Sequence, residues 1–235
     1  MVDVVLPCYN EELALPIILE SVPSGFNIIV ADNGSTDGSK LLAQAYGAVV
    51  VDEGRRGIGY ATNAGLREAT SEIICVLDCD GTVRLEDLLP LITPIAAGHA
   101  DLVIATRSFE AGSVSPARRA LFRLAGMLVN RLIDHRVTDL GSARAFRREI
   151  VKHSLDRLGN GTSWSIDLVR IASMQSLRIV EIPTPFYPRY GISKVTGTLS
   201  GAVLTSIETL SSLIKHLKEQ SGISPIPRLR EPREL

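Results

Sequence analysis

The sequence has little of several features that define common protein classes. Its 235 residues include three cysteines, one tryptophan and only 5% aromatic residues. Three cysteines form no disulfide framework, and Cys75 and Cys79 lack zinc-finger spacing, so we expect buried thiols in a reducing compartment. The longest uncharged stretches, such as residues 88–100 and 195–207, reach about 13 residues, which is short of the roughly 20 that cross a bilayer.

Three motifs of well-known enzyme classes are also absent. The chain has no G-x-x-x-x-G-K-[ST] motif, which disfavours P-loop kinases and ATPases. No G-x-G-x-x-G follows the first strand pattern, and no G-x-S-x-G occurs, which argues against a dinucleotide-binding Rossmann domain and a hydrolase nucleophile elbow. The histidines are scattered over helix and loop patterns, and we interpret them as surface residues: His99, His135, His153 and His216.

Each half of the chain is poor in charge of one sign, although the total net charge is only −1. Residues 1–106 hold 15 acidic and 5 basic residues, whereas residues 107–235 hold 11 acidic and 20 basic residues. A near-neutral total argues against a dedicated nucleic-acid-binding protein. The opposed halves suggest a site built from both, with a cation on one side and an anion on the other. The alternative is that solvated helix surfaces carry the imbalance.

What the first 106 residues do contain is an alternation of short apolar runs with helical patterns. This alternation predicts an α/β fold with a parallel sheet that helices cover on both faces. We expect strands at residues 2–6, 27–31, 48–51, 73–77 and 102–105. We expect helices at 11–21, from the capping residues 35–37 to 46, from a Gly-rich loop to 69, and at 85–97. Ligands of such sheets bind outside the carboxyl ends of the strands.

The second half of the chain is less regular. Its patterns predict strands at 142–146 and 178–182, and helices at 117–133, 147–156, 163–173 and 199–217. A proline-rich stretch follows the strand at 178–182. The last 15 residues, 221–235, have little apolar character and three prolines, and we interpret them as a flexible tail.

Acidic residues follow three of the expected strands. Asp78 and Asp80 come directly after the run at 73–77, and residues two apart in an extended segment point the same way, so both can address one cation. Hard carboxylate ligands suit Mg²⁺ or Mn²⁺ completed by substrate phosphates. Asp32 follows the second strand, where it would also suit a capped turn. After the first strand, Tyr9 could stack on a planar base and Glu11 could accept a hydrogen bond from it.

The motifs resemble those of the family-2 glycosyltransferases of the GT-A fold. The resemblance rests on VLPCYNEE at residues 5–12, ADNGSTDGS at 31–39 and LDCDG at 77–81. It continues through DLGSAR at 139–144 and YGISK at 190–194, which are most similar to the branch with dolichol-phosphate mannose synthases and other polyprenyl-phosphate glycosyltransferases. The likeness spans residues 2–200, with the motifs in the family's order.

The resemblance implies one GT-A domain over residues 1–220, with a nucleotide-binding half at 1–106 and an acceptor-binding half at 107–220. The residues that it implies for the nucleotide's base and ribose are Pro7, Tyr9, Glu11 and Asp32. Asp78 and Asp80 would bind the Mg²⁺ or Mn²⁺ ion that bridges the donor's diphosphate. Such an ion stabilises the charge that develops on the leaving nucleoside diphosphate.

The basic half acquires a role from the same resemblance. The residues implied to hold the diphosphate or an acceptor phosphate are Arg107, Arg144, Arg189 and Lys194, because basic side chains suit phosphate oxygens and a guanidinium binds them bidentately. Arg118 and Arg119 could assist or be solvated. A phosphate acceptor needs no general base, since it is already a nucleophile. A hydroxyl acceptor needs one, and Asp167 lies near the family's base position.

Two residues depart from the family pattern. Asn33 replaces the second acid of the common Asp-Asp-Gly-Ser turn, which weakens a charged contact to the ribose at this position. Thr82 stands two residues after Asp80, where some dolichol-phosphate enzymes carry an amide that helps the metal site. The second departure puts GDP-mannose in doubt as the donor and leaves UDP-sugars open.

The sequence therefore predicts a metal-dependent, inverting glycosyltransferase that uses a UDP- or GDP-sugar, with a polyprenyl phosphate or another small acceptor. One alternative is a sugar-phosphate or cofactor nucleotidyltransferase, although those enzymes usually place a Gly-rich, Arg-containing loop where this chain has residues 7–11. Another is a non-catalytic nucleotide-sugar binding module. We expect a cytoplasmic protein. The apolar stripe at 199–217 suits core packing, which we favour, or peripheral contact with the inner face of the membrane.

Overall fold

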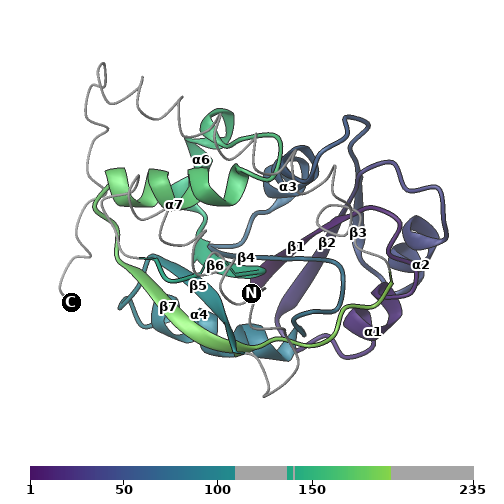
Figure 1. Cartoon of the computed structure of the whole chain (residues 1–235), viewed down its shortest axis with the longest axis horizontal. Coiled ribbons are helices and arrows are strands. Elements are labelled where there is room, and N and C mark those ends of the chain that lie inside the picture. The colour runs from purple at the N-terminus through teal and green to yellow at the C-terminus, as the bar shows by residue number, and fades with distance from the viewer. Residues whose placement is uncertain (109–136, 140, 192–235) are drawn as a thin grey trace, which may run out of the picture.

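The computed structural model describes residues 1–108, 137–139 and 141–191, and within them the chain forms one seven-stranded sheet (Figure 1). The strand order is β3-β2-β1-β4-β6-β5-β7. The strands are β1 (Val2–Cys8), β2 (Phe26–Asp32), β3 (Val49–Asp52), β4 (Ile73–Leu77), β5 (Leu102–Ser108), β6 (Ala143–Arg147) and β7 (Ile179–Pro185). Neighbouring strands are parallel except at β6, which runs antiparallel to both β4 and β5. The expected α/β fold with a mostly parallel sheet is confirmed.

Helices cover both faces of this sheet (Figure 1). Side chains of α1 (Leu15–Leu19), α2 (Ser39–Ala45) and α4 (Leu89–Ala96) pack into one buried core. Side chains of α3 (Ile58–Glu68), α6 (Glu149–Lys152) and α7 (Trp164–Met174) pack into the core on the opposite face. Two short 3₁₀ turns, η1 (Glu86–Leu88) and η2 (Leu155–Arg157), precede α4 and follow α6.

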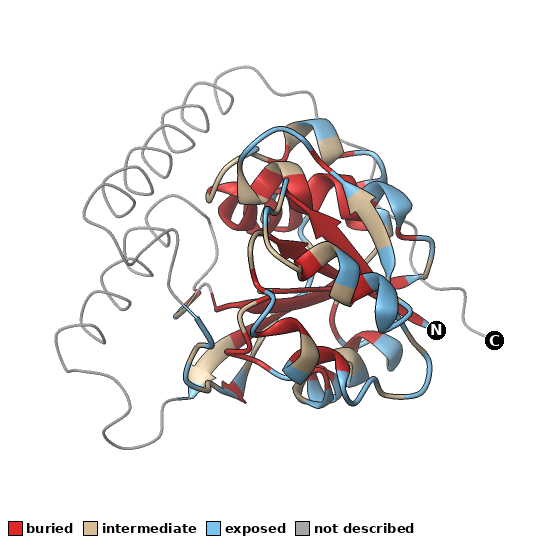
Figure 2. Ribbon diagram, turned by 90° about the vertical axis from the view of Figure 1, so that its right-hand side faces the viewer, coloured by how far each residue is buried: buried red, intermediate tan, exposed pale blue. Residues whose placement is uncertain are grey.

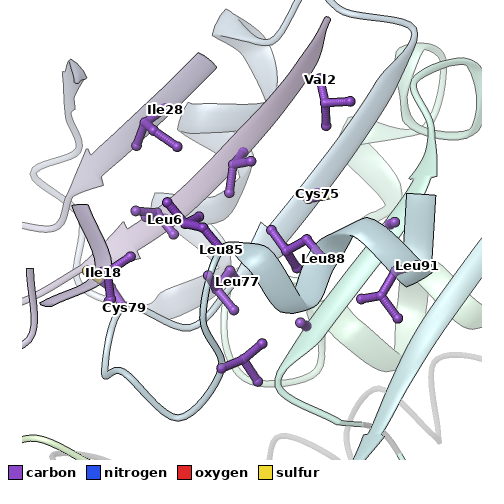
Figure 3. Close-up of a cluster of buried hydrophobic side chains, with 14 of the residues drawn as sticks. Val2, Leu6, Ile18, Ile28, Cys75, Leu77, Cys79, Leu85, Leu88 and Leu91 are labelled. Atoms are coloured by element: carbon purple, nitrogen blue, oxygen red, sulfur yellow. The ribbon is translucent and has the colours of Figure 1, made fainter. Parts of the chain in front are cut away.

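The inner strands alternate their side chains between the two cores, as the pleat of a sheet requires. In β1, Val4 and Leu6 belong to the core of α1, α2 and α4, which Figure 3 shows in close-up, whereas Val5 belongs to the opposite core. In β4, Cys75 and Leu77 also belong to the first core. Because both faces of these strands are buried (Figure 2), their sequences are apolar at nearly every position rather than alternating, with Asp3 the exception in β1.

Two expected helices are shorter in the structure than in the prediction. The helix expected at 11–21 is reduced to α1, because the start of that range is a loop in which the Glu11 amide donates to Ser39 Oγ across a distance of 2.8 Å. The helix expected at 147–156 begins later, because Arg147 still belongs to β6, opposite Ile73 of β4, and the rest of the range is divided into α6 and η2. In both places, loop and strand contacts replace the local helical pattern.

Strand β7 is longer than the predicted strand at 178–182, and it includes Pro183 and Pro185. Among the described strands it lies at one edge of the sheet, paired in parallel with β5. An edge strand tolerates proline, since one side of its backbone has no ladder hydrogen bond to lose. The proline-rich stretch therefore extends the strand and delivers the chain to the carboxyl ends of the other parallel strands.

Several predictions fall outside the described residues. They are the helices at 117–133 and 199–217, the tail at 221–235, Arg118, Arg119, His135, Lys194 and His216. The domain boundaries expected at 106 and 220 also stay predictions. Within the described ranges, no helix has both the length and the apolar character that crossing a membrane requires.

Candidate active site

The carboxyl ends of β1, β2 and β4 meet at one edge of the sheet, because β1 lies between the other two and all three are parallel. The residues predicted at strand ends therefore share this edge: Tyr9 and Glu11 follow β1, Asp32 ends β2, and Asp78 and Asp80 follow β4. The chain places β2 and β3 on one side of β1 and β4 on the other side, so the direction in which strands are added reverses at β1. Open α/β sheets bind their ligands at such a point.

The loops after β1 and β2 are joined by hydrogen bonds that fix their shape. The Asn10 amide donates to Ser35 Oγ at 2.9 Å, and the Thr36 amide donates to Asn10 Oδ1 at 2.7 Å. Asn10 has a left-handed backbone with a φ of 54°, a conformation that asparagine adopts more readily than most residues. The Glu11 amide is held by Ser39 in the same way. These bonds hold the Glu11 backbone at the edge before any ligand arrives.

The two carboxylate oxygens of Asp32 differ in their hydrogen bonds. One accepts from backbone amides, and the other has no hydrogen-bond partner among the described residues. Its Oδ2 accepts from the amides of Gly34 and Ser35, each at 3.1 Å. Its Oδ1 is buried and no described group donates to it. A buried acceptor of this kind is costly unless a donor reaches it. The Asp32 carboxylate is therefore suited to accept a hydrogen bond from a ligand hydroxyl or N–H group.

Asn33 holds the loop that follows β3. Its Nδ2 donates to the carbonyl oxygens of Glu53, at 3.0 Å, and Arg55, at 2.6 Å, while its Oδ1 accepts from the Gly57 amide at 2.9 Å. Only an amide can donate at one atom and accept at the other, so a carboxylate cannot replace it. The departure from the family's acidic residue therefore has a structural explanation.

The aromatic ring of Tyr9 is covered by an arginine from that same loop. The Arg56 Cζ atom lies 3.8 Å from the centroid of the Tyr9 ring, which is a cation–π contact. Pro7, which precedes Tyr9, is buried in β1 opposite Ala31 of β2. The loop after β3 thus contacts Tyr9 itself, and the loop after β2 is bonded to its neighbour Asn10.

Asp78 and Asp80 stand at the end of β4 in different environments. Thr82 donates to Asp80 Oδ1 from both its hydroxyl, at 2.6 Å, and its amide, at 3.1 Å, which orients the Asp80 carboxylate. Burial, together with the charge of Asp80, raises the pKa of Asp78 to about 7, although nearby arginines act in the opposite direction. A partly buried carboxyl with an acidic neighbour gains from a cation that both can share.

These two carboxylates fit Mg²⁺ or Mn²⁺. Within the described ranges, no group of three or more His, Cys, Asp or Glu side chains is placed to hold a metal ion. Mg²⁺ commonly binds through one or two carboxylates and completes its shell with substrate phosphates and water, and Mn²⁺ shares its preference for oxygen ligands. Asp78 and Asp80 are therefore suited to hold a cation together with a phosphorylated ligand.

Arg189 connects the two acidic parts of the edge. One guanidinium nitrogen, NH2, lies 2.6 Å from Glu11 Oε1, and the other, NH1, lies 3.3 Å from Asp80 Oδ2. The arginine comes from the basic half of the sequence and both acids come from the acidic half. The predicted meeting of the two halves at one site is thus present in these ion pairs.

The segment that carries Arg189 runs along the loop after β4. The Tyr187 amide donates to the Thr82 carbonyl at 2.9 Å, and the Tyr190 amide donates to the Asp80 carbonyl at 3.0 Å. Gly81, between them, has a φ of +76°, and a Cβ added there would lie 2.6 Å from the Tyr190 ring. Glycine is therefore required at this position for two reasons, backbone conformation and space.

Two further arginines influence Asp78. The charges of both Arg144 and Arg107 lower its pKa, against the effect of burial. Arg107 is fixed by Asp139, whose Oδ2 accepts from the Arg107 amide at 3.0 Å and whose Oδ1 lies 3.3 Å from NH1. Arg144 is buried, with its Cζ 5.3 Å from the Trp164 ring centroid; burial lowers its pKa to about 10, so it stays cationic.

Asp167 lies in α7 and is buried rather than on the helix surface. Its Oδ2 accepts from the Gly159 amide at 2.9 Å and from Ser163 Oγ at 3.4 Å, and its Oδ1 lies 3.5 Å from the Arg170 Nε atom. These contacts hold the loop before α7. A role for Asp167 as a general base stays a prediction.

Sequence reasoning missed two of these contacts, Thr82 with Asp80 and Arg56 with Tyr9. The contact of Thr82 with Asp80 could have been predicted, because an aspartate often accepts a hydrogen bond from the residue two positions later. The contact of Arg56 with Tyr9 could not, since the two residues are joined only by the fold. Cys8 precedes Tyr9, and Cys79 lies between Asp78 and Asp80. Both are free and buried, as expected for thiols of the core.

Comparison with known proteins gives matches over most of the chain. Residues 3–155 match the family described as Glycosyl transferase family 2. An uncharacterised glycosyltransferase of Mycobacterium tuberculosis is 37% identical over 212 residues, covering 88% of this chain and 95% of the relative. A polyprenol monophosphomannose synthase of Mycolicibacterium smegmatis is 32% identical over 216 residues, covering 83% of this chain and 81% of the relative.

Among solved structures, the chain is similar to glucosyl-3-phosphoglycerate synthase of Mycobacterium tuberculosis in complex with Mn²⁺, UDP and glucosyl-3-phosphoglycerate. The TM-score is 0.72 at 23% sequence identity, and the match covers 92% of this chain and 79% of the other. At this level of identity the comparison establishes a shared fold.

Proposed function

The chain belongs to glycosyltransferase family 2, and from this premise we propose that it transfers a sugar from a nucleotide-diphosphate sugar to a polyprenyl phosphate. We propose further that the transfer is metal-dependent and inverts the anomeric carbon. The observation that carries the proposal is the meeting, at one sheet edge, of the Asp78 and Asp80 carboxylates with three arginines from the other half of the chain.

The nucleoside of the donor would lie over the ends of β1 and β2. A ribose hydroxyl would satisfy the buried Oδ1 of Asp32, which no described residue contacts through a hydrogen bond. Tyr9 would stack on the base with the ring face that Arg56 does not cover, and Glu11 would offer an acceptor beside it. Both UDP and GDP suit this description, and the UDP bound by the synthase of similar fold favours a UDP-sugar as the first donor to test.

Asp78 and Asp80 would hold a divalent cation, Mg²⁺ or Mn²⁺, at the diphosphate. When bound, such an ion neutralises the charge that develops on the departing nucleoside diphosphate. Thr82 contributes by fixing the orientation of the Asp80 carboxylate, and Arg189 contributes by contacting its other oxygen. Both residues hold Asp80 in place without occupying Asp78.

The arginines would provide the anion-binding side of the site. Arg107, Arg144 and Arg189 would face phosphate oxygens, and Lys194, outside the described residues, would join them. Attack on the anomeric carbon from the face opposite the leaving diphosphate inverts its configuration. An acceptor phosphate is already anionic and needs no general base, whereas a hydroxyl acceptor would need Asp167 to take the proton.

The choice of acceptor is supported by the relative named as a polyprenol monophosphomannose synthase, at 32% identity. A phosphate-bearing acceptor also suits the surplus of basic residues in the second half of the chain. A polyprenyl acceptor would bring the protein into peripheral contact with the inner face of the membrane. Two other functions stay less favoured. Family membership argues against a nucleotidyltransferase, and the paired carboxylates argue against a non-catalytic binding module.

Radiolabelled sugar transfer tests the proposal. The purified protein is incubated with Mn²⁺ or Mg²⁺, a UDP- or GDP-sugar labelled in the sugar, and farnesyl phosphate as a short polyprenyl phosphate. We expect label in the organic phase with at least one donor. We expect the Asp80→Asn variant to lose at least about 100-fold in rate, in the range seen when one group that stabilises a developing charge is removed.

Asp52→Asn is the matched control, because Asp52 is an exposed carboxylate paired with Lys40 at the end of β3, and two strands separate β3 from β4. It should retain the rate of the unaltered protein. Transfer that gives only a water-soluble product would refute the lipid acceptor and retain the glycosyltransferase. Full activity of Asp80→Asn would refute the role of the carboxylate pair.

A further inference from the structure

A separate pocket of about 240 Å³ lies between α3 and the segment that follows α6. Tyr60, Asn63 and Arg67 line it from α3, and Arg55 lines it from the loop before that helix. The three α3 residues are three and four positions apart, so they share one face of the helix. The opposite wall consists of Leu155, Asp156, Leu158 and Asn160.

The two walls are fixed to each other at one end of the pocket. The Tyr60 amide donates to the Asn160 carbonyl at 3.0 Å. A Cβ added to Gly59 would lie 2.3 Å from the Gly159 carbonyl oxygen, so only glycine allows the helix and the segment to come this close. The pocket is therefore bounded by a tight backbone contact.

Asn63 lines the pocket and carries a buried acceptor. The residue is only 3% exposed, and no described group donates a hydrogen bond to its Oδ1 atom. A buried amide oxygen needs a donor, which a hydroxyl or amino group of a ligand can supply. Asp156, on the other wall, adds a carboxylate that also accepts hydrogen bonds.

Arg55 is held in a defined position although it is partly exposed. Glu53 binds its Nε at 2.9 Å and its NH2 at 2.7 Å, and the Arg55 Cζ lies 4.5 Å from the Tyr60 ring centroid. The hydrogen bonds from Arg55 lower the pKa of Glu53 to about 2, so the pair stays ionised. Arg67, on the same face of α3 as Tyr60, adds a second guanidinium to the pocket.

We propose that this pocket binds a small phosphorylated sugar or polyol, at a site separate from the candidate active site. The guanidinium groups of Arg55 and Arg67 would hold the phosphate. The Asn63 Oδ1 and the Asp156 carboxylate would accept from hydroxyl groups. A volume of about 240 Å³ lies just below the 300 Å³ at which pockets for drug-sized ligands begin, which suits a smaller molecule.

The pocket shares a loop with the nucleotide side of the active site. Arg55 lines the pocket, and its neighbour Arg56 covers the Tyr9 ring. Asn33, next to Asp32, holds the same loop through the carbonyl oxygen of Arg55. A ligand that fixes Arg55 would therefore change the affinity of the active site for nucleotide, and nucleotide would change the affinity of the pocket equally. This coupling, unlike the pocket itself, rests on the proposed function.

Calorimetric titration without metal or nucleotide tests the pocket independently of catalysis. The probes are glucose 6-phosphate, inorganic phosphate and glucose, added to the full chain. We expect glucose 6-phosphate to bind most tightly and phosphate more weakly. Arg67→Gln should raise the Kd for glucose 6-phosphate about tenfold, the loss of roughly one charge-assisted hydrogen bond. Because Arg67 is exposed, its variant should keep the melting temperature of the unaltered protein.

Two control variants separate this site from other anion sites. Lys152→Gln removes an exposed charge from α6, and Arg189→Gln removes one from the active site; both should leave the Kd for glucose 6-phosphate unchanged. The proposal is wrong if glucose 6-phosphate does not saturate the protein, or if Arg67→Gln binds it normally. It is also wrong if Arg189→Gln abolishes binding, since the phosphate then occupies the active site. The coupling alone fails if glucose 6-phosphate binds but leaves nucleotide affinity unchanged.

Discussion

At the scale of single residues, the number of hydrogen bonds that a side chain can donate and accept decides which residue suits each position at the sheet edge. Asn33 must donate twice and accept once, whereas its neighbour Asp32 accepts from two amides at one oxygen and from no described donor at the other. Two similar-sized side chains next to each other therefore have different tasks. Thr82 fixes Asp80 by the same logic, because its hydroxyl and amide both donate to one carboxylate oxygen.

The substitution Asn33→Asp tests this account of the loop after β3. A carboxylate would face the Glu53 and Arg55 carbonyl oxygens without a proton to donate, while it could still accept from Gly57. We expect the free energy of unfolding to fall by about 2–4 kcal/mol, since two buried hydrogen bonds are lost. Urea denaturation measures this change. Gln44→Glu, the same chemical change at an exposed position of α2, should alter stability by less than about 0.5 kcal/mol. Equal stability of Asn33→Asp and the unaltered protein would contradict the account.

At the scale of elements, the strands were easier to predict than the helices. A strand buried on both faces is a continuous apolar run, and β4 has the bounds predicted from its sequence. Helix ends depend on contacts with distant loops, which is why α1 and α6 are shorter than their local patterns. The place of β6 between β4 and β5 also could not be read from local sequence, because its antiparallel pairing depends on how the chain returns to the sheet.

The amino-terminal part of β1 offers a prediction about stability and pH. Asp3 accepts hydrogen bonds from the Thr70 and Ser71 amides, the Ser71 hydroxyl and the Asn27 side chain, which tie β1 to β2 and to the turn before β4. Burial acts to raise the pKa of Asp3, but these hydrogen bonds together hold it below its ordinary value. The ionised carboxylate therefore stabilises the folded state above the unfolded pKa of about 3.9.

Asp3→Asn should destabilise the protein at pH 7 by about 1–3 kcal/mol, because an amide cannot accept from all of these donors. The difference from the unaltered protein should begin to shrink as the pH falls below about 4, where Asp3 of the unfolded chain takes up a proton, and it should be lost as the pH falls through the lower pKa of the folded state. Thermal unfolding followed by circular dichroism at pH 7 and pH 3 measures both effects. Asp52→Asn, which removes an exposed ion pair, should have little effect at either pH. A difference for Asp3→Asn that is as large at pH 3 as at pH 7 would refute this account.

At the scale of the whole molecule, the uneven charge of the two halves becomes a local feature of one edge. The sequence was enough to predict the fold class, the acids at strand ends and the meeting of acidic and basic halves. It was not enough to show that Arg189 contacts both Glu11 and Asp80, because the contact with Glu11 spans 178 residues and both contacts depend on the path of β7 along the sheet edge. Arg56, on Tyr9, depends in the same way on the fold of the loop after β3.

The central claim is that this edge binds a nucleoside diphosphate together with a divalent cation. Calorimetric titration of UDP and GDP into the protein, with and without Mn²⁺, tests it most directly, with Asp80→Asn as the variant and Asp52→Asn as the control. We predict that Mn²⁺ increases the affinity for at least one nucleotide about tenfold or more, and that Asp80→Asn loses this increase while Asp52→Asn retains it. Nucleotide affinity that is the same with and without Mn²⁺, or an undiminished Mn²⁺ effect in Asp80→Asn, would contradict the claim.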